Sequence, residues 1–144
     1  MSDQELILVD AGGVRATIQA SSRHLTDAPQ EYGGYVTDIT RTWPISGRFS
    51  AAQRDLYEAV LKIQRQLVSL CREDADVSLD ELHAKSEEGL RTDLETLGFD
   101  LRDGAMGTLF PHHVSHHVGL DVHDLPGWSR KIKIKAGECI TIEP

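Results

Sequence analysis

Hydrophobic residues recur at intervals of three and four beyond Ser50, which is the spacing of one face of an α-helix. Ser50 and Gln53 form a capping box, in which the serine hydroxyl accepts from a helix amide and the glutamine reaches back. Ser78 and Glu81 repeat this arrangement, and a second amphipathic pattern follows until a glycine. Two long packing helices are therefore predicted. Their charged residues are interpreted as a solvated face and His83 as a surface helix residue. The predicted apolar stripes are Leu56, Val60, Ile63, Leu67, Leu70 and Leu79, Leu82, Leu90, Leu94, Leu97.

Two apolar runs before these helices predict strands, at residues 6–9 and 32–40, with residues 41–44 closing the second. The first run ends at Asp10 in a glycine turn, where the aspartate is either a turn former or a ligand. Residues 14–30 have neither a helix nor a strand period and are expected to form a loop. The two strands therefore resemble a hairpin with an oversized connection.

Weaker patterns fill the rest of the chain after the second helix. Residues 99–110 are expected to form a glycine-containing connection with a weak strand, followed by an extended segment over residues 116–123. Alternating basic and apolar residues predict an edge strand at 128–135, and a last strand at 138–143. Antiparallel strands with two amphipathic helices indicate an α+β domain.

Composition narrows the class of protein. A chain of 144 residues fits one domain, and its net charge of −8 argues against general affinity for nucleic acid or anionic lipid. No apolar run reaches the roughly 18 residues that a membrane span needs, and the first residues show no targeting pattern. Cys71 and Cys139 have no metal-binding spacing, so both are expected to be buried free thiols in a reducing, intracellular compartment.

Histidines are concentrated in one stretch. Five of the seven lie within residues 112–123, with Asp121 and Asp124 interleaved. Such a cluster is either a metal and acid–base site or a polar loop with loose metal affinity. A proline, a glycine and several valines oppose a long helix here, so His112 and His116 are not expected to form a helical zinc pair.

Carboxylates from other strands would complete such a site. Two aspartates on paired strands, a histidine on a third and a glutamate on a fourth could converge. They would then form a dinuclear site for hard or borderline divalent cations, which lower the pKa of a bridging water and so generate a nucleophile.

Four ordered blocks of the sequence resemble the Xaa-Pro aminopeptidase and prolidase group of metallopeptidases. They are Leu-Val-Asp-Ala-Gly at 8–12, Val-Thr-Asp-Ile-Thr-Arg-Thr-Trp-Pro at 36–44, His-His-Val-Gly-Leu-Asp-Val-His-Asp at 116–124 and Thr-Ile-Glu-Pro at 141–144. The group shares the pita-bread fold with methionine aminopeptidases. The second block is similar to the eukaryotic, mitochondrial-type branch.

The resemblance implies a dinuclear metal centre. Asp10 would ligate one ion and Asp38 would bridge both, while His116 and Glu143 would ligate the other. The ions in this family are usually manganese, so the expected cofactors are two divalent cations, manganese by resemblance.

The resemblance also implies catalytic and substrate-binding roles. His112 and His123 would line the substrate pocket, with His123 supporting the oxyanion, and Glu143 would handle the proton of the attacking water. The expected partner is a peptide with proline at its second position, whose N-terminal residue is released. His113 and His117 match no family role and are interpreted as local structure.

The chain departs from the family pattern at both ends. The family has a second bridging glutamate on a strand that follows the position of Glu143, and this sequence does not contain it. The family also has a catalytic histidine and a separate domain before the position of Asp10, and both are missing here. We therefore expect an incomplete catalytic domain over residues 1–144, with a partial pita-bread fold and weak or no activity. A non-catalytic pita-bread module that binds peptides or proteins is the alternative. The expected compartment is intracellular, either mitochondrial or cytoplasmic. A targeting segment, which would distinguish the two, is not present in this sequence.

The third departure lies between the two aspartates. Asp10 and Asp38 are 28 positions apart, 17 more than the spacing of 11 in the family, and residues 14–30 number 17. Removing them restores a tight hairpin, so we hypothesise that they are a translated intron. Valine codons begin GT and one glutamine codon is CAG, which matches intron ends. The alternative is a surface loop insertion, which costs little free energy.

Overall fold

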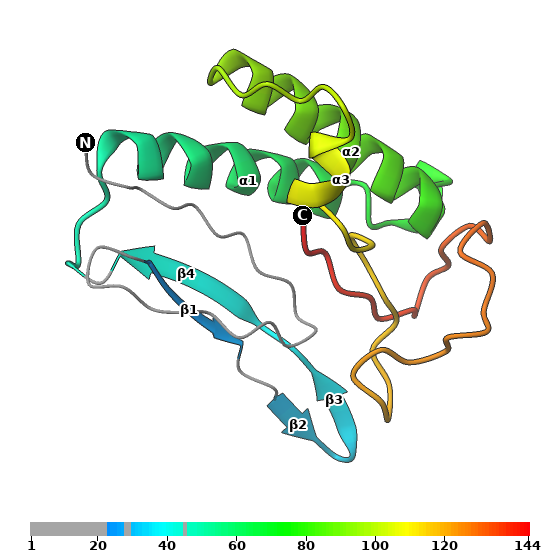
Figure 1. Cartoon of the computed structure of the whole chain (residues 1–144). Helices are drawn as coiled ribbons and strands as arrows, with labels where there is room; N and C mark the ends of the chain where they lie inside the picture. Colours follow the sequence, from blue (N-terminus) through cyan, green and yellow to red (C-terminus); the bar gives the residue numbers. More distant parts are fainter. Residues whose placement is uncertain (1–22, 28–29, 45) are drawn as a thin grey trace.

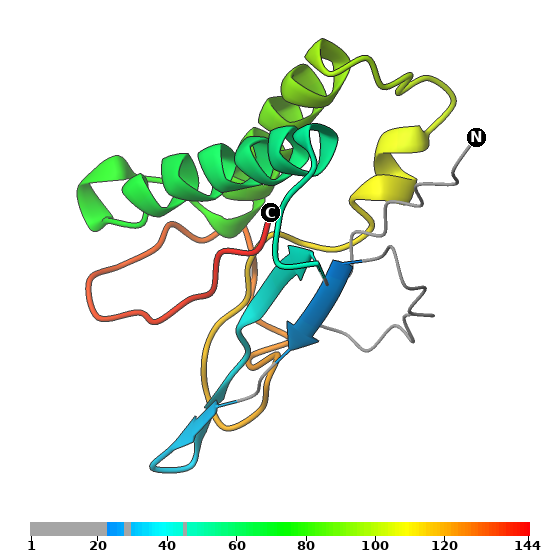
Figure 2. The same ribbon diagram turned by 90° about the vertical axis from the view of Figure 1, so that its left-hand side faces the viewer.

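The computed structural model describes residues 23–27, 30–44 and 46–144, with strands on one side and helices on the other (Figure 1). The helices pack on each other, and the end of the chain lies between them and the strands in both views (Figures 1 and 2). The elements are β1 Arg23–Asp27, β2 Gln30–Tyr32, β3 Tyr35–Thr37, β4 Thr40–Pro44, α1 Ala51–Ser69, a 3₁₀ turn Glu73–Ala75, α2 Leu79–Thr96 and α3 Ala105–Leu109.

The strands form two antiparallel pairs, β1 with β4 and β2 with β3. In the first pair Arg23 lies opposite Pro44 and Asp27 opposite Thr40. Strands β2 and β3 form a hairpin whose two turn residues are glycines with φ of 63° and 87°. Positive φ at both positions is the backbone of the turn that suits the twist of paired strands, and glycine adopts it without strain. The α+β class predicted from the sequence is confirmed.

Both predicted capping boxes are present. The Gln53 amide donates to Ser50 Oγ at 3.3 Å, and the Ser50 amide donates to Gln53 Oε1 at 3.0 Å. At the start of α2 the Glu81 amide donates to Ser78 Oγ at 3.3 Å, and the Ser78 amide donates to Glu81 Oε2 at 2.7 Å. Each box satisfies two amides that the helix itself leaves without partners, which fixes where each helix begins.

The hydrophobic core lies between the apolar stripes of the two long helices and the segment that follows α3. Leu67 of α1 and Leu82 of α2 are 2% and 0% exposed, and Val114, in the histidine-rich segment, is 0% exposed. Burial of Val114 packs the histidine-rich segment against the helices, so the hydrophobic core fixes the position of the backbone that carries the histidines. The buried core residues are Ile63, Leu67, Val77, Leu79, Leu82, Leu90, Leu94, Leu101, Met106, Phe110, Val114 and Ile134.

Two predictions for the N-terminal part are wrong. Residues 23–27 form β1 rather than part of a loop, and residues 41–44 belong to β4 instead of closing a strand. Backbone pairing between β1 and β4 selects these strands, and a partner distant in sequence leaves no local period to read. The predicted strand at 6–9 and Asp10 lie outside the described residues.

Predictions for the C-terminal part also need correction. The weak strand within residues 99–110 is the short helix α3, which buries Met106 at 3% exposure. Residues 128–135 and 138–143 form no continuous strands; each contributes one isolated bridge, to Ser78 and to His117. Continuous ladders need several registered pairs, and a turn at residues 130–131 interrupts the first of these segments.

Both cysteines are free, as predicted, but they are not both buried. Cys71 is half-buried and its thiol donates to the Leu67 carbonyl at 3.3 Å, whereas Cys139 is exposed. Burial raises the pKa of the Cys71 thiol. Among the residues that the structure describes, no helix is long and apolar enough to cross a bilayer.

Candidate metal centre

The β2–β3 hairpin positions Asp38 next to the histidine-rich segment. Asp38 lies in the short link between β3 and β4 and is 8% exposed. Two residues earlier, the Val36 amide donates to the Gly119 carbonyl at 2.8 Å. This bond ties β3 to the loop that carries His116 and His123, so the aspartate is held beside them.

The end of the chain pairs with the same segment in an antiparallel register. The Val118 amide donates to the Cys139 carbonyl at 3.0 Å, and the Thr141 amide donates to the His116 carbonyl at 2.9 Å. The Glu143 amide donates to the Val114 carbonyl at 2.7 Å. His116 therefore lies opposite Thr141, and Glu143, two residues further on, points to the same face because side chains alternate in extended backbone.

Side chains from these three segments meet at His116. Its Nε2 lies 2.9 Å from Glu143 Oε1 and 3.4 Å from Asp38 Oδ1. The His123 ring centroid lies 4.5 Å from that of His116. One ligand atom from each of Asp38, His116 and His123 lies within 4.8 Å of the others. The structure thus brings together three of the four predicted ligands, Asp38, His116 and Glu143, and adds His123 to the group.

The tautomer of His116 suits a metal ligand. Its Nδ1 lies 3.1 Å from the His117 carbonyl, to which only a protonated nitrogen can donate. In the neutral ring the lone pair then sits on Nε2 and faces two carboxylates. Both His116 Nε2 and Glu143 Oε1 are buried without a well-aligned hydrogen bond among the described residues. A ring nitrogen and carboxylate oxygens facing one another are a donor set for a divalent cation such as manganese or zinc, so the residues fit the implied metal.

The pKa values of His116 and Glu143 shift in opposite directions because the two groups interact. Burial lowers the pKa of His116. Its contacts with Glu143 and the His117 carbonyl, together with the nearby Asp38 carboxylate, outweigh burial and raise this pKa overall. Burial raises the pKa of Glu143, but its contacts with His116 and Thr141 outweigh burial and lower it overall. Both shifts favour a positive charge between ionised carboxylates, which is the charge a bound cation would bring.

The remaining predicted residues have different positions. His112 Nδ1 lies 3.1 Å from the His113 carbonyl, and its ring meets Phe110 edge to face at 4.9 Å. Asp124 accepts from the amides of Leu120 and Leu125 at 2.8 and 2.7 Å, so it shapes the loop. Asp121 carries no ligand atom in the donor group found among the described residues. Asp10 is outside those residues.

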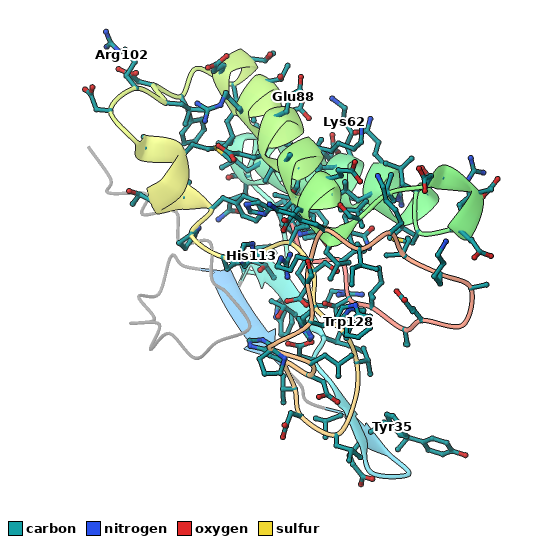
Figure 3. All side chains as sticks on the ribbon, turned by 90° about the vertical axis from the view of Figure 1, so that its right-hand side faces the viewer. Tyr35, Lys62, Glu88, Arg102, His113 and Trp128 are labelled. Atoms are coloured by element: carbon teal, nitrogen blue, oxygen red, sulfur yellow. The ribbon has the colours of Figure 1, made fainter. Side chains whose placement is uncertain are left out.

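His83 of α2 packs against the histidine-rich segment, a contact that the sequence did not predict. Its ring stacks on Phe110 at 5.2 Å and meets His113 edge to face at 5.1 Å, so this predicted surface helix residue is half-buried by ring packing. Figure 3 labels His113 between α2 and the strands. Burial lowers the pKa of His83, and the nearby His113 lowers it further. The available signal was its spacing of four from Leu79 on the apolar face of α2.

Comparison with known proteins identifies the family. Residues 7–144 match the sequence profile of metallopeptidase family M24. The chain belongs to this family of metallo-aminopeptidases. It is 44% identical to intermediate cleaving peptidase 55 of Saccharomyces cerevisiae over all of this chain and 25% of that protein. It is 41% identical to human Xaa-Pro aminopeptidase 3 over 83% of this chain and 24% of that protein.

Solved structures place this M24 chain in the predicted fold. The crystal structure of Icp55 from S. cerevisiae aligns with a TM-score of 0.79 and 46% identity, covering 85% of this chain and 32% of the other. Zinc-substituted aminopeptidase P of Escherichia coli in complex with product aligns with a TM-score of 0.68 and 33% identity, over 83% of this chain and 29% of that one. The partial pita-bread fold is confirmed, and the chain spans about a quarter of the length of its curated relatives.

Proposed function

We propose that this chain carries the metal-binding core of an aminopeptidase that releases the N-terminal residue preceding proline. The observation that carries the proposal is the meeting of Asp38 and Glu143 at the buried Nε2 atom of His116. The names of two relatives, Xaa-Pro aminopeptidase 3 and intermediate cleaving peptidase 55, support the reaction class. Asp10 is proposed as a fourth ligand by the resemblance.

The cofactor is proposed to be two divalent cations, manganese by resemblance. Asp38, His116 and Glu143 would hold them together with Asp10. When bound, the cations supply the Lewis acidity that makes a water molecule nucleophilic at neutral pH. Family membership supports metal dependence, and the oxygen and nitrogen donors suit manganese.

The chain's own residues would then handle protons and substrate. The lowered pKa of Glu143 keeps its carboxylate ionised, so it can accept a proton from the attacking water. His123, packed against the His116 ring, would donate a hydrogen bond to the oxyanion that forms on the attacked amide. His112 would line the pocket for the residue that follows the scissile bond. The compartment is proposed to be mitochondrial or cytoplasmic.

Metal-dependent binding of a substrate-like inhibitor tests this proposal. One structure of Icp55 from S. cerevisiae is bound to the inhibitor apstatin. We expect apstatin to bind this chain in calorimetry when Mn²⁺ is present and not in excess EDTA. A peptide with proline second should compete with apstatin, and the same peptide with alanine second should compete poorly. His116→Ala should remove metal-dependent binding. Equal binding with Mn²⁺ and EDTA would overturn the proposal.

A further inference from the structure

We propose that Arg130 is a positioning residue for the metal centre, acting through the peptide bond that precedes His116. This inference rests on the proposed function for its meaning, but its test also has a readout that needs no metal. Arg130 donates from Nη1 to the Ser115 carbonyl at 2.9 Å. That carbonyl belongs to the same planar peptide unit as the His116 amide.

The Ser115–His116 peptide unit is held at both of its polar atoms. At one side Arg130 binds the Ser115 oxygen, and at the other the His116 amide donates to Thr141 Oγ1 at 3.1 Å. Because the unit is planar, fixing both atoms fixes its orientation and therefore the direction of the His116 side chain. Ser115 is 1% exposed, so water does not replace the guanidinium there.

The guanidinium is itself anchored to α2. Arg130 Nε donates to Asp80 Oδ1 at 3.2 Å, and the Asp80 amide donates back to the Arg130 carbonyl at 3.1 Å. Asp80 stands in the first turn of α2, where the helix dipole favours a negative charge. The segment after Arg130 is also bound next to the start of α2, since the Ile134 amide donates to the Val77 carbonyl at 2.9 Å. The arginine therefore connects the rigid helix start to the ligand-bearing segment.

A planar guanidinium is suited to this bridge. Its Nε and Nη1 bind an acceptor on α2 and an acceptor on the site segment at the same time, which a single ammonium group does less well. Charge-assisted hydrogen bonds are also stronger than neutral ones. Among the described residues, the side-chain hydrogen bonds of Arg130 go to Asp80 and the Ser115 carbonyl and not to a candidate ligand, so its effect runs through His116.

The molecule offers a matched control ion pair. Lys62 of α1 binds Asp93 of α2 at 2.6 and 2.9 Å, so Asp93 is a second carboxylate that ties α2 to a distant cation. This pair lines a groove between the two helices whose lining includes none of the four predicted metal ligands. Asp93→Asn should therefore alter stability without altering the metal centre.

The test compares Arg130→Met, Arg130→Lys and Asp93→Asn with the wild type in the 144-residue chain. We expect Arg130→Met to weaken Mn²⁺ binding about tenfold, the lower end for groups that orient metal ligands. The Mn²⁺ affinity of Arg130→Lys should lie between those of the wild type and Arg130→Met, and the Mn²⁺ affinity of Asp93→Asn should stay near that of the wild type. The positioning role of Arg130 would be overturned if folded Arg130→Met bound Mn²⁺ as tightly as the wild type, or if Asp93→Asn lost as much Mn²⁺ affinity as Arg130→Met.

Amide hydrogen exchange in metal-free protein supplies the second readout. The amides of His116 and Thr141 should exchange about tenfold faster in Arg130→Met and unchanged in Asp93→Asn, because local opening controls exchange. If the wild type binds no Mn²⁺, the proposed function fails, while the exchange rates still decide the role of Arg130. Unchanged exchange in Arg130→Met would refute positioning even if the metal is bound.

Discussion

Nε2 of His116 lies 2.9 Å from Oε1 of Glu143 because an antiparallel pairing of backbone carries both residues. The Thr141 amide binds the His116 carbonyl, which fixes the register between the two segments. Register decides which side chains share a face, so a slip of one residue would turn Glu143 away. The centre is thus a consequence of pairing between two segments for which the sequence predicts extended backbone.

His123 is expected to serve the substrate rather than the metal. It contacts His116 through ring packing at 4.5 Å, whereas Glu143 and Asp38 approach Nε2 directly. We predict that His123→Ala lowers apstatin affinity about tenfold, the loss of about one hydrogen bond, while Mn²⁺ affinity changes less than about threefold. Calorimetry of both ligands checks this, with His117→Ala as the control. A loss of Mn²⁺ binding as large as in His116→Ala would make His123 a ligand.

Gly119 is predicted to tolerate no side chain. A Cβ there would lie 1.6 Å from Asp124 Oδ2, the atom that accepts from the Leu120 amide. Gly119→Ala must displace that carboxylate and the bridge to Val36, so we expect a loss of about 1–3 kcal/mol in the free energy of unfolding, as for overpacking. Urea unfolding measures it. Gly127→Ala, where a Cβ meets nothing within 4 Å, should stay within about 0.5 kcal/mol.

Acid should weaken the start of α2. Lys133 and the Ser78 amide hydrogen-bond Glu81 and lower its pKa from 4.5 to about 2. A carboxyl whose pKa is lower when folded stabilises the fold above pH 4.5, and this contribution is lost as the pH falls toward 2. Glu81→Gln should therefore show a shallower fall in stability between pH 5 and pH 2.5 than the wild type. Urea midpoints across that range measure it, and Glu88→Gln on the same helix should follow the wild-type curve.

Residues 14–30 are predicted to be dispensable. Their removal deletes β1, but it joins Gly13 to Glu31 and lets the predicted strand at 6–9 pair in its place. We expect the deletion variant to bind Mn²⁺ more tightly, because Asp10 then approaches Asp38. Mature transcripts should join Gly13 to Glu31 directly. Transcripts that all retain the segment, together with weaker Mn²⁺ binding after deletion, would show it to be a genuine insertion.

The sequence predicted the helices well because their signals are local. The capping boxes at Ser50 and Ser78 and the apolar stripes lie within each helix, so no distant contact was needed to see them. Strand β1 has no period in its sequence and depends on a partner further along the chain, and the bridge from Lys133 to Ser78 joins two distant segments. Local patterns cannot report such partners.

The site was predicted through the resemblance, and what it left out is the support around the ligands. Asp38, His116 and Glu143 stand in recognisable blocks, so their meeting was expected. The guanidinium of Arg130 on the Ser115 carbonyl and the packing of His83 on Phe110 follow from tertiary contacts alone. An arginine among alternating lysines gave no sign of this bridge.

Anomalous diffraction from crystals soaked in Mn²⁺ tests the central claim most directly. We predict a manganese peak within coordination distance of His116 Nε2 and of carboxylate oxygens of Asp38 and Glu143, which already lie 3.4 and 2.9 Å from that nitrogen. The peak should vanish in His116→Ala crystals of the same form. Manganese bound elsewhere on the chain, or the same peak without His116, would contradict the assignment of this centre.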